Sequence, residues 1–462
     1  MPGREMTTTQ IPTEPARRRL PGPPRTQTFV LLRQLLGDRL AMMSNAADRY
    51  GDAVRIAVGP KTLYFFNQPD YAKHVLADNS ANYHKGIGLH QARRALGDGL
   101  LTSEGELWRK QRKVIQPAFQ AKRIAGQAGV IVREASAMIG RLRELVGTGP
   151  VNITAQMTGL TLGVLGRTLL DEDLAGYGTI GHSFEAVQDQ AMFEMVTLGA
   201  VPMWLPLPHQ LRFRRARAEL QQVVDELTEA RRAQPSADGD DVLSRLIESV
   251  RAEADPKVGR VRMRDELITL LLAGHETTAS TLSWCFHLIA GHPEVGERVR
   301  AEALEALGDR DPEYEDLNRL VYTSMVVEEA MRLYPPVWML SRIAQGPDEI
   351  GGYRVPSGAD VVVCPYTMHR NPRFWDAPEV FDPERFSTQR RAERPRYAYI
   401  PFGAGPRFCV GNHLGMMEAV FVLAMVSREL RLEHVPGHPV VPEPMLSLRV
   451  RGGLRMTVSA QS

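Results

Sequence analysis

The chain has 462 residues, of which 43% are hydrophobic and 24% are charged. These values are ordinary for a globular protein and exclude a disordered or collagen-like chain. The formal charge is only +2, from 56 basic and 54 acidic residues, which excludes a general nucleic-acid binder with its basic excess.

The low cysteine content and the shortness of the apolar stretches indicate a protein of the reducing cytoplasm. Three cysteines, Cys285, Cys364 and Cys409, are too few for a disulfide framework in a chain of this length. No stretch reaches the roughly 18 consecutive apolar residues of a membrane-spanning helix. The basic run at 17–19 is followed by prolines, not by the unbroken apolar region of a secretory signal. We therefore expect a cytoplasmic monomer with neither nucleic acid nor membrane as partner.

The expected elements follow one another around a long helical region. Residues 1–27, rich in Thr, Pro and Arg, lack periodicity, and we expect a mobile segment there. Residues 28–462 are expected to form a single domain, because no linker or repeat divides them. Apolar spacing and turn residues predict a helix over 29–50, a hairpin over 53–58 and 62–66, helices over 69–330, strands over 349–365, a loop over 371–401, a helix from 411 and strands over 430–460.

A glycine-rich loop with one cysteine, residues 401–411, precedes the last predicted helix. A thiol at this place faces the positive end of a helix dipole and backbone N–H groups, which favour the thiolate. Gly403, Gly405 and Gly411 would let the backbone adopt special φ values and approach a flat group closely. A thiolate on such a loop is the arrangement that ligates a haem iron from one side.

Other interpretations of Cys409 remain open at this point. It could be a small buried packing residue, the commonest role of a cysteine. It could also act as a nucleophile with His413 as its base, although neither an oxyanion site nor an orienting group can be identified. A zinc site is poorly supported, because Cys285 and Cys364 lack C-x-x-C spacing.

Two helical segments upstream carry polar residues in unusual surroundings. In the apolar helix predicted over 265–290, Glu276 and Thr277 occupy the middle, where an acid is costly unless it is used. The adjacent His275 and Glu276 do not form a zinc-protease motif, because that motif needs a histidine where Ala279 stands. Further along, Glu329 and Arg332 share one helix face at i and i+3 and can pair.

A third segment near the start is basic. Trp108 and Arg112 lie one turn apart on a predicted helix, and Arg109, Lys110 and Lys113 make its exposed face positive. Such a charge run is commonly a solvated face. A docking site for an acidic protein is the alternative.

Four motifs in order resemble the cytochrome P-450 superfamily, of the bacterial type, over nearly the whole chain from about residue 28. Phe402, Gly405, Cys409 and Gly411 match the haem-binding pattern F-x-x-G-x-x-x-C-x-G. The other three are Ala273-Gly274-x-Glu276-Thr277, the E-x-x-R pair Glu329 and Arg332, and the W-x-x-x-R pair Trp108 and Arg112.

The resemblance implies a role for each residue. Cys409 would be the axial thiolate on the iron, and Thr277 with Glu276 would deliver protons to bound oxygen through a local opening of the helix. Arg385 would join Glu329 and Arg332 in a structural triad that holds the cysteine loop. Haem contacts are implied for Trp108, Arg112, Arg342, Arg407, Phe402, Gly403, Gly411 and Ala273, and electron-donor docking for Arg109, Lys110 and Lys113.

The resemblance also implies the fold and the chemistry. The fold would be mainly α with smaller β-sheets, with haem b buried between a long central helix and the cysteine-loop helix. The activity would be monooxygenation of an apolar small molecule with dioxygen, using a separate ferredoxin and ferredoxin reductase. A terpenoid or polyketide is the first expectation for the substrate and a fatty acid the second. Alternatives are a haem-thiolate isomerase, dehydratase or peroxide-using enzyme, and a non-catalytic haem sensor.

The resemblance also implies a substrate pocket, built from the loop 87–101, the region 184–211, the central helix near Ala273, the segment 337–340 and a turn near residues 446 and 447. The side chains expected to line it are apolar and adaptable. They are Met192, Met195, Met203, Trp204, Trp338, Met339 and Leu446.

Overall fold

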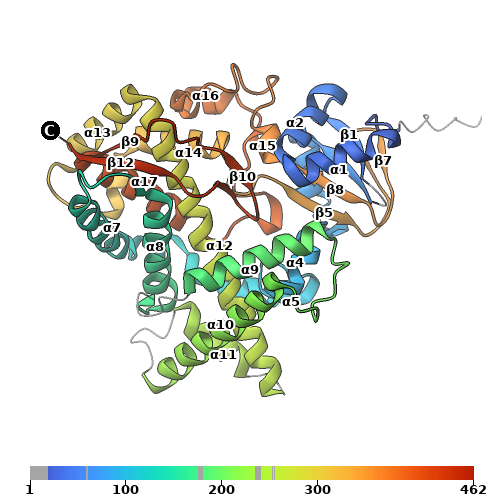
Figure 1. Cartoon of the computed structure of the whole chain (residues 1–462), viewed down its shortest axis with the longest axis horizontal. Helices are drawn as coiled ribbons and strands as arrows, with labels where there is room; N and C mark the ends of the chain where they lie inside the picture. Colours follow the sequence, from blue (N-terminus) through green and yellow to red (C-terminus); the bar gives the residue numbers. More distant parts are fainter. Residues whose placement is uncertain are drawn as a thin grey trace, which may run out of the picture.

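A computed structural model describes residues 19–58, 61–174, 180–234, 241–251, 253 and 255–461. Helices make up most of this part of the chain, and the sheets are small, as Figure 1 shows. The expected fold class, mainly α with smaller β-sheets, is therefore confirmed.

The N-terminal segment is only partly as expected. Of the segment 1–27 expected to be mobile, residues 1–18 lie outside the described residues, whereas residues 19–27 pack on the domain. Leu20 is buried, and the backbone N–H of Arg55 donates to the carbonyl of Pro21 at 2.7 Å. Two helices, α1 (Thr28–Gly37) and α2 (Arg39–Tyr50), replace the single one predicted. Asp38 separates them because its carboxylate caps α2 at the N–H of Ala41.

A five-stranded sheet of order β1-β2-β8-β5-β3 lies beside these helices. The predicted hairpin is its edge, with Ala53 opposite Phe66. β3 pairs with β5 so that Lys85 lies opposite Arg342, and this register brings two basic residues together. The strands are β1 (Ala53–Val58), β2 (Lys61–Phe66), β3 (Tyr83–Lys85), β5 (Leu340–Ala344) and β8 (Asp360–Val363), with the separate pair β6 (Asp348–Ile350) and β7 (Tyr353–Val355) nearby.

The helical part is built around α12 (Pro256–Gly291), the longest helix in the described part of the chain. It packs against α8, α14 and α17, and most apolar residues of its middle turns are buried. The helix starts at Pro256, nine residues before the predicted start at 265, because Asp255 caps it and Pro256 occupies its first turn. Its end before Pro293 is as expected.

The helix α12 runs through the middle of the helical part, as Figure 1 shows, and further helices complete the chain. They are α3 (Pro69–Lys73), α4 (Leu89–Leu96), α5 (Gly105–Ile115), α6 (Ala121–Ala125), α7 (Ala128–Glu144), α8 (Ile153–Leu165), α9 (Ile180–Val196), α10 (Pro208–Ala233), α11 (Val242–Arg251), α13 (Pro293–Leu307), α14 (Val321–Leu333), α15 (Pro365–Met368), α16 (Thr388–Glu393) and α17 (Asn412–Glu429). A π-helical turn, η2 (His74–Asp78), continues α3.

The segments around the cysteine loop are short and irregular. The predicted loop 371–401 contains a 3-10 turn, η8 (Pro383–Phe386), and the short helix α16. Another 3-10 turn, η10 (Gly405–Arg407), precedes Cys409. The C-terminal segment is stranded as predicted: β12 (Arg455–Ala460) pairs with β4 (Val151–Asn152) and β9 (Leu430–His434), while β10 (Pro442–Pro444) pairs with β11 (Leu448–Val450).

Candidate active site

The cysteine loop is a fixed turn that ends at the N-terminus of α17. The N–H of Cys409 donates to the carbonyl of Phe402 at 3.0 Å, and the N–H of Phe408 donates to that of Gly405 at 3.0 Å. Gly403 and Gly405 have φ values of 72° and 68°, which side chains disfavour. A Cβ on Gly405 would lie 1.9 Å from the carbonyl oxygen of Leu76 in η2, so only glycine fits there.

Gly411 departs from the expectation. Its φ is −92°, an ordinary value, and a Cβ there would meet the ring of Phe119 at 3.5 Å, an ordinary contact. The local backbone therefore does not require glycine at this position, whereas it does at Gly403 and Gly405.

The cysteine itself is accessible. Cys409 is exposed, while Cys285 and Cys364 are buried, so the interpretation of Cys409 as a buried packing residue is wrong. Desolvation raises the pKa of the Cys409 thiol; the N–H of Gly411 and the charge of Arg112 oppose this effect but are smaller. The loop alone therefore does not favour the thiolate as expected, and a bound cation would have to ionise the sulfur.

On α12, the space over the middle turns is open on one side. Ala273 is exposed although Leu271 and Leu272 are buried. Thr277 stands one turn later, and its hydroxyl donates to the carbonyl of Ala273 at 2.7 Å. The local opening expected here is not present, because α12 is continuous through these residues.

Three more hydroxyls bind carbonyls of the same turns. Thr278 donates to Gly274 at 3.2 Å, and Thr281 donates to Thr277 at 2.9 Å. From the neighbouring helix α8, Thr161 donates to the carbonyl of His275 at 3.0 Å.

Glu276 points to a polar cavity beside α12. Its carboxylate accepts a hydrogen bond of 2.7 Å from the hydroxyl of Ser447. Burial raises the pKa of Glu276, and the Ser447 hydroxyl and the Arg449 charge lower it by less. The cavity, of about 230 Å³, has room for several waters. Its polar lining includes Thr154, Thr158, His182, Glu185, Gln188, Glu276, Ser280, Ser283 and Arg449.

A cationic cluster lies where β3, β5, α5 and the cysteine loop meet. It consists of Lys85, Arg342 and Arg407, with Glu104 as its carboxylate. Arg407 pairs with Glu104, donates to the carbonyl of Ser103 at 3.0 Å, and stacks over the ring of Trp108 at 4.3 Å.

The charges of this cluster are only partly balanced. Burial lowers the pKa of Arg342 to about 10, and the charge of Arg407 adds to this effect. Desolvation lowers the pKa of Lys85 well below its usual value, and Arg342 and Arg407 lower it further. Three basic side chains therefore share one carboxylate. No local sequence pattern predicts the role of Lys85, because its neighbour Arg342 is far away in the sequence.

Arg112 lies beside this cluster and contacts the cysteine loop directly. It donates to the carbonyl of Phe408 at 2.9 Å and to the side chain of Gln116 at 3.2 Å. Trp108 and Arg112 therefore both contact the cysteine loop, one through Arg407 and the other through Phe408.

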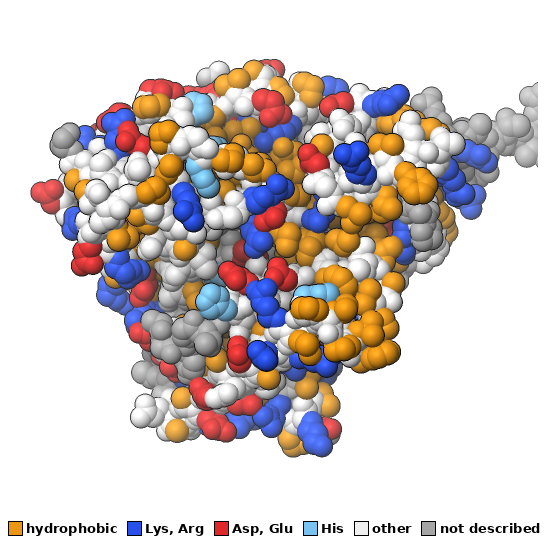
Figure 2. Space-filling model, in the orientation of Figure 1, with side chains coloured by type: hydrophobic (Ala, Val, Ile, Leu, Met, Phe, Trp, Pro, Cys, Tyr) orange, Lys and Arg blue, Asp and Glu red, His pale blue; other side chains and the backbone are white. Residues whose placement is uncertain are grey.

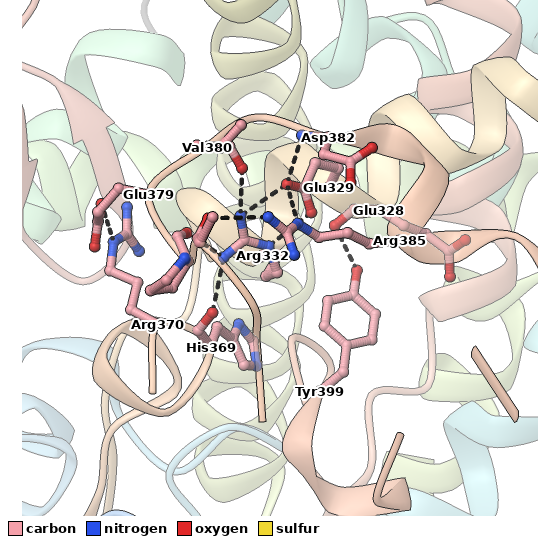
Figure 3. A network of polar contacts seen from close by, with 12 residues as sticks. Glu328, Glu329, Arg332, His369, Arg370, Glu379, Val380, Asp382, Arg385 and Tyr399 are labelled. Atoms are coloured by element: carbon pink, nitrogen blue, oxygen red, sulfur yellow. Dashed lines mark hydrogen bonds and ion pairs between the residues drawn. The ribbon is translucent and has the colours of Figure 1, made fainter. Parts of the chain in front are cut away.

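Glu329, Arg332 and Arg385 lie together in the structure, as Figure 3 shows. Arg332 binds both oxygens of the Glu329 carboxylate, at 2.6 and 2.7 Å. Arg385, on η8, lies 3.4 Å from the same carboxylate, which also accepts from the N–H of Asp382 at 3.0 Å. The remaining N–H groups of Arg332 bind the carbonyls of His369, Pro378 and Val380.

Two acids of α12 hold the segment after α4. Asp265 accepts from the N–H of Asp98 at 2.9 Å, and Glu266 accepts from the N–H of Leu100 at 3.0 Å. Gly97 approaches so closely that a Cβ would lie 2.1 Å from the Asp265 carboxyl group. The second oxygen of Glu266 is buried without a partner, and burial raises the pKa of Glu266 to about 8.

Comparison with known proteins agrees with this arrangement. The sequence model of the family described as Cytochrome P450 matches residues 20–456. The chain belongs to the cytochrome P450 family. It is therefore a cytochrome P450 monooxygenase, and the family binds haem b through a cysteine thiolate.

Bacterial relatives of this cytochrome P450 match over most of its length. Cyclooctatin synthase of Streptomyces melanosporofaciens is 36% identical over 88% of each chain. Cyclooctat-9-en-7-ol 5-monooxygenase of the same organism is 37% identical over 84% of each chain. Pentalenene oxygenase of Streptomyces avermitilis is 30% identical over 93% of this chain and 94% of its own.

The residues of this cytochrome P450 fit a haem. The Cys409 thiol and the Ala273 side chain on the central helix are both exposed, so each is accessible to a bound group. The cationic cluster lacks enough carboxylates of its own, and haem brings two. A zinc site is not supported: within the described residues, no group of three or more His, Cys, Asp or Glu side chains could hold a metal ion.

The remaining predicted residues lie at the surface or in the core. Arg109, Lys110 and Lys113 are exposed on α5. Trp204 is 74% exposed at the surface, contrary to the expectation that it lines the substrate pocket. Trp338 is buried in the core near α2, where its indole N–H donates to the carbonyl of Met445 at 3.0 Å. Among the helices of the described residues, none is both long and apolar enough to cross a bilayer.

Proposed function

We propose that this cytochrome P450 oxidises an apolar terpenoid. The support is the set of relatives, whose names refer to cyclooctatin, cyclooctat-9-en-7-ol and pentalenene. The expected alternatives, a polyketide or a fatty acid, become comparison substrates in the test below.

The observation that carries the assignment of the site is Cys409. Of the chain's three cysteines it is the accessible one, on a loop whose glycines permit close approach. It precedes α17, which packs against α12, the helix that carries Ala273 and Thr277. We assign Cys409 as the haem ligand, and Phe402, Gly403 and Gly411 of the loop and Ala273 of α12 would contact the haem.

The propionates of the haem would be held by the cationic cluster. Arg342, Arg407 and Lys85 are the candidates, because they share a single carboxylate, Glu104. Arg112 and Trp108 support the same region from α5. Glu329, Arg332 and Arg385 would keep the cysteine loop in position and would touch neither haem nor substrate.

Bound haem supplies the activation of dioxygen, and two side chains of the chain would manage protons. The Thr277 hydroxyl faces the open side of α12 and can rotate from the Ala273 carbonyl to donate elsewhere. Glu276 contacts the polar cavity and can exchange protons with water there. Electrons would come from a ferredoxin and its reductase, with Arg109, Lys110 and Lys113 as the exposed basic face for docking.

The test uses the holoenzyme with a ferredoxin, its reductase and labelled dioxygen. A cyclic terpenoid hydrocarbon, a terpenoid alcohol, a macrolide-type polyketide and a fatty acid are offered in turn. We expect label in a terpenoid product and little in the others. Preferred labelling of the fatty acid or polyketide would refute the substrate class, and so would the absence of label from both terpenoid products.

Cysteine variants test the ligand. We expect Cys409→His to bind haem but to lose the thiolate absorption of the reduced carbon monoxide complex and the activity. The matched control is Cys364→Ser, because Cys364 is buried and its hydroxyl replacement can keep the contact with the carbonyl of Trp338. A thiolate spectrum in Cys409→His would overturn the assignment.

Two neighbouring threonines test the proton role. We expect Thr277→Val to keep haem and substrate binding but to release about tenfold more hydrogen peroxide per electron pair, because a donor facing the site is lost. Thr278→Val, which removes a comparable back-bonded hydroxyl on the buried side of α12, should leave coupling unchanged. Equal uncoupling in both variants would assign the effect to helix geometry.

A further inference from the structure

A turn between the C-terminal strands contacts the acid of the central helix. Residues 445–447 connect β10 to β11, and the hydroxyl of Ser447 donates to the carboxyl group of Glu276 at 2.7 Å. Ser447 is only 2% exposed, so this hydroxyl is shielded from bulk water. A hydrogen bond from a hydroxyl to a carboxylate is short and strong, and it orients both groups. The Glu276 side chain is therefore directed toward the turn.

The C-terminal end of the turn is held by contacts that do not involve Glu276. The carbonyl of Leu448 accepts from the hydroxyl of Ser280 at 2.6 Å and from the indole N–H of Trp284 at 2.9 Å. The N–H of Leu448 donates to the carbonyl of Pro336 at 2.9 Å. These three bonds tie the start of β11 to α12 and to the segment after α14.

The other end of the turn is fixed in the same way. The carbonyl of Met445 accepts from the indole N–H of Trp338 at 3.0 Å. The N–H of Met445 donates to the carbonyl of Ser447 at 2.9 Å, which closes the turn. Because the backbone on both sides of Ser447 is held without Glu276, the serine directs the acid and does not simply follow it.

Glu276 also lines the polar cavity of about 230 Å³, which is bordered by α8, α9, α12 and β11. Charged side chains of both signs gather near the middle of the face shown in Figure 2, where α8, α9 and the C-terminal strands approach one another in Figure 1. Water in a polar cavity of this size can supply and accept protons. The carboxyl group is therefore able to change its protonation state while it stays buried.

The charge nearest to this carboxyl group is already partly balanced. From β11, Arg449 lowers the pKa of Glu276, by less than the Ser447 hydroxyl does. The Arg449 guanidinium is itself bound to Glu443 at 2.9 Å. From α8, the side chains in the cavity lining are threonines and carry no charge.

The remaining titratable groups around Glu276 have little influence on it. From α9, His182 and Glu185 line the cavity, but both are exposed, so solvent screens their charges. On α12, the neighbouring His275 donates through Nδ1 to the carbonyl of Leu271 at 2.5 Å, and burial lowers its pKa, which keeps the ring neutral. Ser447 is thus the strongest specific contact of the acid.

We propose that Ser447 is a positioning residue for Glu276. Its hydroxyl holds the carboxyl group toward the β10–β11 turn and determines the pH at which the acid releases its proton. This inference rests on the proposed function, in which Glu276 manages protons. Burial raises the pKa of Glu276, and the Ser447 hydroxyl opposes this effect because it stabilises the ionised carboxylate.

The value of such a contact follows from what a proton donor requires. A general acid is most effective when its pKa lies near the working pH, because it must both hold its proton and release it. A buried carboxyl group without a donor would hold its proton too tightly. Ser447 supplies that donor from a rigid turn, so Glu276 can be buried and still release its proton.

Infrared titration of the substrate-free holoprotein tests the proposal. The C=O band of protonated Glu276 is identified as the band that Glu276→Gln removes, because other buried acids such as Glu266 also have a raised pKa. We expect Ser447→Ala to raise the midpoint of this band by about one pH unit, which is a tenfold increase in proton affinity. An unchanged midpoint would overturn the proposal.

Ser280→Ala is the matched control. Ser280 is likewise buried and binds the same turn, but its hydroxyl contacts the carbonyl of Leu448 and not the carboxyl group. We expect this variant to keep the original midpoint. Equal shifts in both serine variants would mean that loosening the turn moves the midpoint, and this result would also overturn the role of the Ser447 hydroxyl.

The pH profile of dioxygen consumption separates this inference from the proposed function. With electrons from ferredoxin and its reductase, we expect consumption to fall as Glu276 ionises, and Ser447→Ala should move the fall about one pH unit higher. If the infrared midpoint shifts and the profile does not, the proton role of Glu276 is refuted and its positioning by Ser447 stands. If neither shifts, the positioning itself is refuted.

Discussion

Two clusters of buried charge in this cytochrome P450 differ in how completely they are paired. Behind the cysteine loop, the Glu329 carboxylate meets Arg332 and Arg385, and the other N–H groups of Arg332 bind carbonyls. In the cationic cluster, Lys85, Arg342 and Arg407 share Glu104 alone. A buried charge is stable only when it is paired and hydrogen-bonded. The first cluster is therefore the more completely paired one, although Nε of Arg385 is buried without a hydrogen bond, and the second has excess positive charge that an anionic ligand would balance.

Removing the Glu329 carboxylate, the centre of the first cluster, should lower the stability of the protein more than any other change predicted here. We expect Glu329→Ala to lower the free energy of unfolding by about 3–5 kcal/mol and to give little holoprotein, because two arginines lose their buried partner. The control Glu328→Ala should cost at most about 1 kcal/mol, because the partner of Glu328, Arg391, is half exposed. Denaturant unfolding measures the free energy of unfolding of both variants, and haem absorption measures their haem content. Full haem content in Glu329→Ala would show that the first cluster does not depend on its carboxylate.

Replacing one cation of each cluster by a neutral side chain should change the melting temperature of the haem-free protein in opposite directions. We expect Lys85→Met to raise the melting temperature of the haem-free protein, because a poorly paired amine is removed, and to speed haem transfer to apomyoglobin about tenfold. Arg385→Met should lower the melting temperature both with and without haem. If Lys85→Met destabilised the haem-free protein, the cationic cluster would be complete without a ligand.

Glu266 is paired less completely than Glu329: one of its carboxylate oxygens accepts a hydrogen bond and the other is buried without a partner. Because burial raises its pKa to about 8, the folded state keeps a proton that the unfolded state releases near pH 4.5. The stabilisation is complete at low pH and is lost as pH rises, by up to about 1.4 kcal/mol per unit below pH 8. We expect Glu266→Gln to remove this slope, as measured by unfolding between pH 6 and 9. An unchanged slope would place the pKa near its ordinary value.

Much of the site could be predicted from the sequence, because its signals are local. The spacing of Glu329 and Arg332 predicts a shared helix face, and the glycines around Cys409 predict a tight loop. The early turns of α12 were missed, because residues 256–264 are mostly exposed and periodicity reports only a buried face. Lys85 was missed for another reason: its environment depends on a strand pairing with Arg342 that no local pattern reveals.

Residues 19–27 were expected to be mobile but pack on the domain, again because of contacts that no local pattern reveals. Their composition favours a loose segment, but a single backbone hydrogen bond to Arg55 and the burial of Leu20 fix them on β1. Trp204 differs from the expectation in the opposite direction, because it is exposed where burial was predicted. Its apolar ring was expected inside, whereas contacts of the neighbouring Arg214 with the backbone hold the loop at the surface.

The four hydroxyl contacts on the middle turns of α12 have a consequence for movement. The carbonyls of Ala273, Gly274, His275 and Thr277 each already accept from a threonine. If the ladder of backbone bonds separates at this turn, each oxygen keeps a donor, so the usual penalty for an orphaned carbonyl does not arise. A local separation of the backbone hydrogen bonds at this turn would therefore cost less free energy than in a helix without these threonines.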